Sequence, residues 1–155
     1  MEADRRKVLT GLGAAALVSL LPARAVAAAP GGFVMWRDPG CGCCLEWAKR
    51  VEKAFGRKLT VVDAPNMVAV KKAQGVPVDL QSCHTALISG YVFEGHVPEA
   101  DIKRLIASRS KIVKGLAVPG MPAGSPGMDV GHDHRQAYKV WSFGPRGKAV
   151  FASHR

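Results

Sequence analysis

Apolar residues recur along the chain with two different spacings, and each spacing predicts a different element. The runs 33–36 and 58–63 are typical of strands, and the first is apolar throughout, which predicts a central strand. Between them, residues 45–55 carry apolar side chains on one helical face and charged side chains on the other, and Gly56 follows as a stop signal. The pattern over 33–63 therefore predicts strand, helix and strand.

The next fifty residues extend this order. A short helix is predicted to start at Asp63-Ala64-Pro65 and to end before Gly75, and residues 76–82 are predicted to be an extended connector. Two β-rich runs around a Ser-Gly turn predict a hairpin over 86–93. A further amphipathic helix is predicted to start at Pro98.

Residues 115–128 break both patterns, because glycine and proline dominate the run GLAVPGMPAGSPGM, and they are predicted to be loop. The runs 137–143 and 149–152 surround a Gly-Pro-Arg-Gly turn and predict a hairpin appended to the core. The order β-α-β-α-β-β-α, with cysteines after the first strand, is thioredoxin-like. We therefore predict an α/β fold, a thioredoxin-like mixed sheet flanked by helices, with a Gly/Pro/Met loop and a C-terminal β-hairpin extension.

The composition is that of one modest domain, and the distribution of basic residues argues against nucleic acid as a partner. The chain has 155 residues, of which 48% are hydrophobic, and a net charge of +10. Its basic residues are scattered over the predicted helices, as at Lys49, Lys71-Lys72 and Lys103-Arg104, with no interleaved aromatic residues. We therefore predict solvated basic surfaces and no nucleic-acid binding.

Residues 1–27 are predicted to be an export signal rather than part of the fold. Arg5-Arg6-Lys7 forms a charged start, residues 8–21 are apolar but rich in Gly and Ala, and small residues permit cleavage near Ala27. The adjacent arginines favour the twin-arginine route, with Sec export and an uncleaved anchor helix as alternatives. A single metal-binding domain, 28–155, is then predicted to work in the periplasm without stable membrane insertion.

Three of the four cysteines lie in one run, Cys41-Gly42-Cys43-Cys44, between the first strand and the first helix. A helix N-terminus favours thiolate over thiol, and thiolates either bind soft metals or attack disulfides. Cys41 and Cys44 form the C-x-x-C frame of a redox pair, but the thiol of Cys43 between them would allow competing disulfides. Thiolate sulfur can bridge several Cu(I) ions, so the run favours a soft-metal site.

Cys83 strengthens the metal interpretation. In a thioredoxin-like topology, the segment before the third strand passes beside the thiols of the first helix, so Cys83 and His84 should lie near Cys41-Gly42-Cys43-Cys44. The alternative is that Cys83 is a small buried apolar side chain. We predict a copper site made by Cys41, Cys43, Cys44 and Cys83.

Further candidate ligands carry a weaker signal. An imidazole beside the thiols, two thioethers in the Gly/Pro-rich loop and an H-x-H motif are all compatible with copper, and they belong to His84, Met121, Met128, His132 and His134. Structural roles, such as gap-filling methionines, are the alternative for each. His96 is predicted to be a structural turn residue.

At these residues the sequence resembles a known family, the CopG-type proteins, which are small exported proteins of copper-resistance operons. The resemblance covers most of residues 36–128 and is carried by WRDPGCGCC, GVPVDLQSCHTA, GYVFEGHVP and GLAVPGMPAGSPGM. It implies a thioredoxin-like domain whose four cysteines bind several copper ions as a thiolate-bridged cluster. It also implies periplasmic copper handling, including interconversion of Cu(I) and Cu(II), and it assigns no role to His132, His134 or the C-terminal hairpin.

Three functional hypotheses follow. The first is a periplasmic protein that holds several Cu(I) ions and contributes to copper resistance, with copper ions and other periplasmic copper-resistance proteins as partners. The second is a thiol–disulfide oxidoreductase that uses Cys41 and Cys44. The third is a structural module in which Cys41 and Cys44 form a simple bridge. The sequence favours metal binding over turnover and leaves catalysis open.

Overall fold

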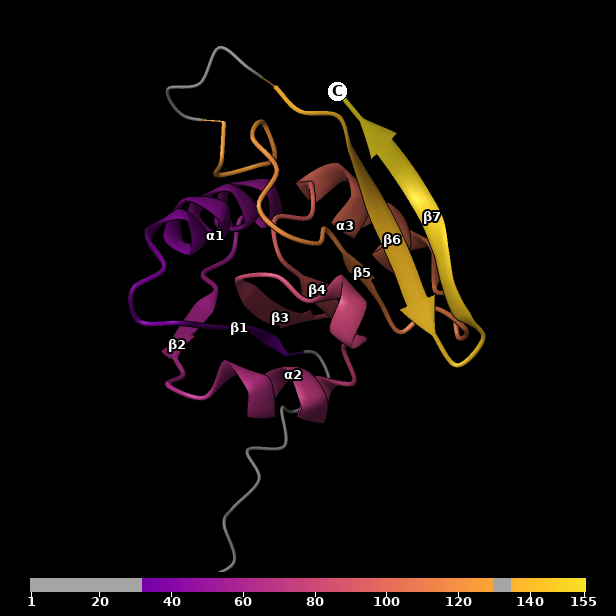
Figure 1. The fold of residues 1–155 in the computed structure, drawn as a ribbon, viewed down its shortest axis with the longest axis horizontal. Coiled ribbons are helices and arrows are strands. Elements are labelled where there is room, and N and C mark those ends of the chain that lie inside the picture. The colour runs from indigo at the N-terminus through magenta and orange to yellow at the C-terminus, as the bar shows by residue number, and fades with distance from the viewer. Residues whose placement is uncertain (1–31, 130–134) are drawn as a thin grey trace, which may run out of the picture.

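The structure is a computed structural model and describes residues 32–129 and 135–155. Within these ranges it contains one mixed sheet of seven strands in the order β2-β1-β3-β4-β5-β6-β7 (Figure 1). The strands are β1 (Phe33–Arg37), β2 (Thr60–Asp63), β3 (His84–Ile88), β4 (Tyr91–Glu94), β5 (Gly115–Ala117), β6 (Tyr138–Gly144) and β7 (Gly147–His154). The predicted mixed sheet is therefore confirmed, and it includes the C-terminal hairpin.

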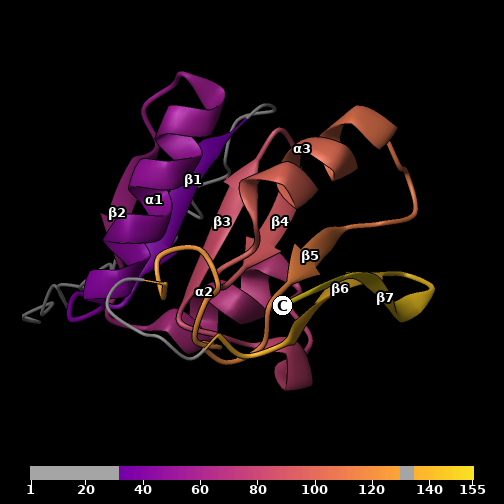
Figure 2. The same cartoon turned by 90° about the horizontal axis from the view of Figure 1, so that it is seen from above.

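Helices cover both faces of the sheet (Figure 2). They are α1 (Gly42–Phe55), α2 (Met67–Gln74) and α3 (Glu99–Ser108). Helices α1 and α3 pack over one face, where Trp47, Val51, Ile102 and Leu105 meet inward side chains of the strands such as Met35. Helix α2 and the short 3-10 helix Val78–Leu80 lie on the other face, above a smaller apolar cluster.

The predicted order β-α-β-α-β-β-α is confirmed, and three details differ. Helix α2 starts later than predicted, because the side chain of Asn66 accepts a hydrogen bond from Ala69 N and caps the first turn. The connector 76–82 is not fully extended, since it contains the 3-10 helix Val78–Leu80. The predicted loop 115–128 begins with a strand, β5, which runs parallel to β4.

Strand β5 was predicted to be loop because the surrounding residues are rich in glycine and proline. A Cβ atom at Gly115 would collide with the carbonyl of Val92 and the ring of Phe143, so the close approach of the neighbouring strands requires glycine there. Strand β5 also pairs with β6, which makes the C-terminal hairpin a continuation of the sheet rather than a separate appendage.

The predicted export signal, residues 1–27, lies outside the described residues. Across 32–129 and 135–155, none of the helices combines the length and the apolar character needed to span a bilayer.

Candidate metal centre

The run of three cysteines lies where β1 gives way to α1. Cys41 is the N-cap residue, and Cys43 and Cys44 occupy the first turn of the helix, which contains no acidic residue. The turn before the helix is closed by two hydrogen bonds, from Cys41 N to Asp38 O (3.0 Å) and from Gly40 N to Asp38 Oδ1 (2.8 Å). The thiols therefore meet the positive end of the helix dipole, as the sequence predicted.

The side chain of Arg37, the last residue of β1, forms hydrogen bonds with the backbone of this turn. Its Nη1 atom donates to the carbonyls of Asp38, Pro39 and Cys41 at 3.3, 3.1 and 2.9 Å. Its Nη2 atom forms an ion pair with Asp63 of β2 at 2.9 Å. One nearly buried guanidinium thus fixes the backbone that carries Cys41.

Cys41 and Cys44 form a disulfide, with their Cα atoms 5.5 Å apart, while Cys43 and Cys83 are free thiols. Cys44 is fully buried and Cys41 is partly exposed. The structure therefore has the C-x-x-C pair in its oxidised form.

Strand pairing brings Cys83 to the same corner of the domain. Strand β3 runs antiparallel to β1 with His84 opposite Arg37, so the start of β3 lies beside the end of β1, where the cysteine turn begins. All four cysteine sulfurs lie within 4.8 Å of one another, and the Sγ atoms of Cys41 and Cys43 are 3.6 Å apart. The convergence of the four sulfurs predicted from topology is therefore present in the structure.

The surroundings of Cys83 make its thiol hard to ionise. Burial, reinforced by the neighbouring charge of Cys43, raises the pKa of the Cys83 thiol to about 12. In the metal-free protein this thiol is therefore protonated at neutral pH. A soft cation must displace that proton to bind, so metal binding here releases a proton.

Two histidines contact Cys83 from the opposite side. The Sγ atom of Cys83 lies 3.3 Å from His84 Nδ1 and 3.1 Å from His96 Nε2. Because His96 Nδ1 lies 2.7 Å from the carbonyl of Pro126, the ring hydrogen belongs on Nδ1 and the lone pair of Nε2 faces the sulfur. The ring of His84 packs against that of Trp47 at a tilt of 49°, with the centroids 4.4 Å apart. Its Nε2 atom is buried without a partner among the described residues.

The position of His96 was missed by sequence reasoning, which assigned it a structural role in a turn. It does lie between β4 and α3, and it is fully buried against Cys83. Cys83, His84 and His96 form a second group whose ligand atoms lie within 4.8 Å of one another. This group shares one sulfur with the four-cysteine group, so the two form one continuous set of soft and borderline donors.

Both imidazoles are held neutral, which predicts an acid-sensitive fold. Burial lowers the pKa of His84, helped by the charges of His96 and Lys71, and burial also lowers the pKa of His96. Below about pH 6.5 an unfolded histidine binds a proton that the folded one does not. As the pH is lowered through this range, the free energy of unfolding should therefore decrease by about 1.4 kcal/mol per pH unit for each histidine. Urea titrations of the metal-free protein in that range measure this slope.

The matched variant for this pH test is His96→Gln, in which the slope should decrease by about one histidine's contribution. Burial raises the pKa of Glu94, which acts in the opposite sense by stabilising the fold as pH falls toward 4.5. The difference between wild type and variant is therefore the quantity to compare. An unchanged slope in His96→Gln would contradict a neutral buried His96.

The loop that follows β5, called the covering loop below, lies beside the start of α1 (Figure 2). The Met121 sulfur lies 4.0 Å from Cys43 Sγ, and the Met121 side chain is about half exposed. A Cβ atom at Gly127 would press on Trp47 N and Cys43 O, so this part of the loop lies directly on the first turn of α1. Met128 contributes backbone hydrogen bonds, to Ser125 O and from Gly124 N.

The other candidate ligands from the sequence differ in whether they lie beside the cysteines. The structure brings His84 and Met121 next to the cysteines, and it gives the Met128 sulfur no such contact. His132 and His134 lie outside the described residues.

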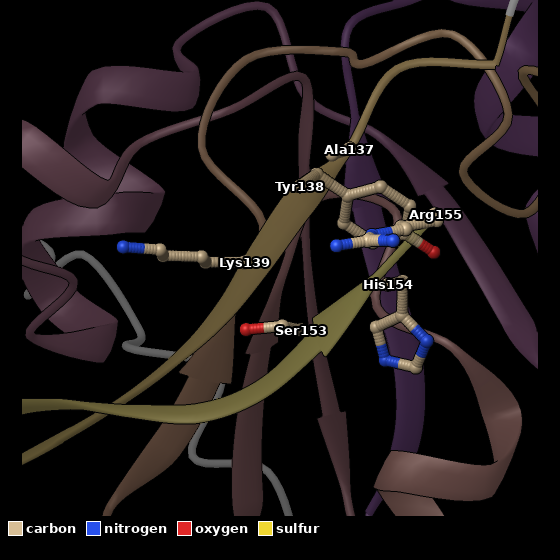
Figure 3. A pocket seen from close by; sticks show the side chains of 6 residues that line it. All are labelled: Ala137, Tyr138, Lys139, Ser153, His154 and Arg155. Carbon is tan, nitrogen blue, oxygen red and sulfur yellow. The ribbon is translucent and has the colours of Figure 1, made fainter.

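A separate surface pocket of about 610 Å³ lies between the ends of β6 and β7 (Figure 3). Tyr138 stacks on His154, whose Nε2 atom lies 2.7 Å from Asp101 Oδ2 on α3. Burial raises the pKa of Tyr138 to about 12, so its hydroxyl is neutral. The pocket shares no residue with the cysteine centre, and its contacts fasten the C-terminal hairpin to α3.

Comparison with known proteins agrees with the sequence resemblance. Residues 80–128 match the family described as "Protein of unknown function, DUF411". Two solved structures, titled "Copper resistance protein copG- Form 1" and "Form 2", are each 43% identical to this chain, with TM-scores of 0.72 and 0.73. The alignments cover 81% and 82% of this chain and 98% and 100% of those chains. No curated protein sequence matches it.

Proposed function

Since this chain belongs to the family of copper resistance protein CopG, we propose that it is a periplasmic protein that holds several Cu(I) ions between bridging cysteine sulfurs and thereby contributes to copper resistance. The observation that carries the proposal is the convergence of four cysteine sulfurs within 4.8 Å at a helix N-terminus. Once the Cys41–Cys44 disulfide is reduced, thiolates this close together would repel one another unless cations lay between them, and soft monovalent copper suits bridging sulfur.

The proposed ligand set starts from Cys41, Cys43, Cys44 and Cys83. Met121 lies beside Cys43 and supports an additional thioether ligand on the exposed side. His84 and His96 lie beside Cys83 and would supply nitrogen on the buried side. Because thiolate favours Cu(I) and imidazole accepts either oxidation state, this mixed set supports interconversion of Cu(I) and Cu(II).

The Cys41–Cys44 disulfide gives copper binding a redox requirement. Two electrons and two protons convert the disulfide into two thiols, which then lose their protons as Cu(I) binds. The oxidised chain offers only the sulfurs of Cys43 and Cys83 as thiolates. Copper capacity should therefore depend on the redox state of this pair.

Anaerobic Cu(I) titration of reduced and disulfide-containing protein tests the proposal. The reduced domain should bind more than one Cu(I) per chain, and the oxidised domain should bind fewer ions, with the difference restored by a dithiol reductant. Copper is counted after gel filtration, and free thiols are counted in the same samples. Equal capacity in both states would show that Cys41 and Cys44 do not hold copper.

A second candidate, a thiol–disulfide oxidoreductase, is favoured by the disulfide itself. Cys41 is the partly exposed N-cap thiol and Cys44 is the buried one, the division between attacking and resolving thiols that such chemistry needs. If Cys43→Ser leaves copper uptake intact while Cys41→Ser abolishes turnover of a dithiol substrate, this candidate replaces the first. A chain with neither property would support the structural module.

The export signal predicted for residues 1–27 supports the proposed periplasmic setting, and copper ions are the proposed cargo. Other periplasmic copper-resistance proteins are the proposed protein partners, since bound Cu(I) must be received from and passed to other sites. Met121, exposed and next to Cys43, offers the soft ligand nearest to solvent for such exchange.

A further inference from the structure

A buried ion pair lies under the start of β3, next to the metal centre. The side chain of Glu94 is fully buried and that of Lys71 is 7% exposed, and Lys71 Nζ lies 2.5 Å from Glu94 Oε1. The sequence pattern predicted a solvated surface for Lys71-Lys72; Lys72 is exposed, whereas Lys71 points inward to Glu94. A pair of this kind is expensive to desolvate and contributes little net stability compared with apolar side chains.

The carboxylate of Glu94 accepts hydrogen bonds from three directions. Lys71 and the backbone N–H of Ser82 donate to Oε1, the latter at 2.6 Å. The hydroxyl of Thr85 donates to Oε2 at 2.6 Å, and Lys71 donates to that hydroxyl at 3.2 Å. Every group in this network is therefore paired, so removal of any one leaves a buried polar group without its partner.

The bond to Ser82 links this network to the metal centre. Ser82 precedes Cys83 and lies outside the ladder of β3, which begins at His84. Its hydroxyl donates to the carbonyl of Gly120 in the covering loop. On the far side of Cys83, His84 O accepts from Gly95 N at 2.9 Å.

We infer that Glu94, held in place by Lys71, is a positioning residue of the metal centre, which fixes the backbone of Ser82 so that Cys83 faces the thiols of α1. This inference rests on the proposed function, since it assigns Cys83 a ligand role. Glu94 touches no donor sulfur, and it acts through one backbone N–H. Outer-shell groups of this type change metal affinity by about 10–100-fold when they are removed.

Two double variants separate positioning from stability and from charge. K71M/E94Q replaces the ion pair by neutral side chains and keeps a carbonyl oxygen for Ser82 N. K71M/E94L removes the same charges and leaves the N–H of Ser82 and the hydroxyl of Thr85 without an acceptor. Cu(I) affinity of the reduced proteins is measured anaerobically by competition with bathocuproine disulfonate, and folding is checked by urea unfolding.

The expected result is that K71M/E94Q retains wild-type Cu(I) affinity and K71M/E94L loses about 10–100-fold. Equal affinities in the two folded variants would reduce Glu94 to a purely structural role and overturn the inference. Equal losses in both would assign the effect to charge, and would also overturn it. In case K71M/E94L does not fold, Glu94→Asp keeps the charge and withdraws the carboxylate by one methylene, and it should lose affinity to a smaller extent.

A copper-free measurement distinguishes failure of this inference from failure of the proposed function. In the oxidised Cys43→Ser protein, Cys83 is the one free thiol of the chain. Adding Glu94→Asp should speed its alkylation by iodoacetamide, because the loosened segment exposes the thiol more often. Unchanged alkylation overturns the positioning role. If Cys83→Ser alone leaves Cu(I) affinity unchanged, the ligand role that the proposed function gives to Cys83 fails whatever Glu94 does. If the reduced wild-type protein binds no Cu(I), the proposed function itself fails.

Discussion

The Cys83→Ser variant is expected to lose most of the multinuclear copper binding that the proposed function requires. Cys83 is the one donor sulfur of the four-cysteine group that comes from outside residues 41–44, and it lies just before β3, whereas the other three lie at the start of α1. Serine keeps the size of the side chain but replaces a soft, bridging thiolate with a hard hydroxyl. Cu(I) affinity should fall by more than about tenfold, the size that even outer-shell changes reach, and the number of bound ions should fall with it.

This expectation is tested by anaerobic titration of the reduced variant beside wild type and Cys43→Ser. Cys43 and Cys83 are both free thiols in the structure, so neither variant disturbs the Cys41–Cys44 pair. Both substitutions should reduce capacity while the far-UV circular dichroism and the urea midpoint stay close to those of wild type. Full capacity in Cys83→Ser would mean that Cys83 is only a small, half-buried apolar side chain, and that copper binds to the helix thiols alone.

The helices and the β3–β4 hairpin could be predicted because local residue signals mark where they end or turn. Gly56 and Gly75 both adopt left-handed backbone at helix ends, and Ser89-Gly90 turns with positive φ at both positions, as a type I′ hairpin turn requires. Such signals act within a few residues of one another, so one sequence is enough to identify them. The convergence of Cys83 with the helix thiols needed a topology as well, and the element order supplied it.

The polar network around the centre could not be predicted in the same way. Lys71, Glu94 and Arg37 are charged residues whose partners lie on other elements, at 23 residues' separation for the Lys71–Glu94 pair. The periodicity of a helix or strand predicts that a charged side chain lies on its polar face. It carries no information about a partner far along the chain. His96 was missed for the same reason, because a histidine in a Gly-His turn has no local feature that indicates burial against a thiol.

Trp47 is expected to be the side chain on which folding of the whole centre depends. It is fully buried on α1, its Nε1 atom donates to Val97 O at 2.9 Å, and its ring supports His84. Trp47→Ala should lower the free energy of unfolding by about 3–5 kcal/mol, a large fraction of the roughly 5–15 kcal/mol of a typical domain. Urea unfolding of the metal-free, disulfide-containing protein measures it.

Trp47→Phe is the matched control, because it keeps an aromatic ring in the core and loses the hydrogen bond to Val97 O. Its loss should be smaller, about 1–3 kcal/mol for the buried carbonyl left without a donor. On the proposed function copper binds the folded state, so reduced, copper-loaded Trp47→Ala should regain part of its stability, and the gain should grow with the logarithm of the ratio of free copper to the dissociation constant. Equal losses in the Ala and Phe variants would show that the hydrogen bond, and not the packing of the ring under His84, is the main contribution of Trp47.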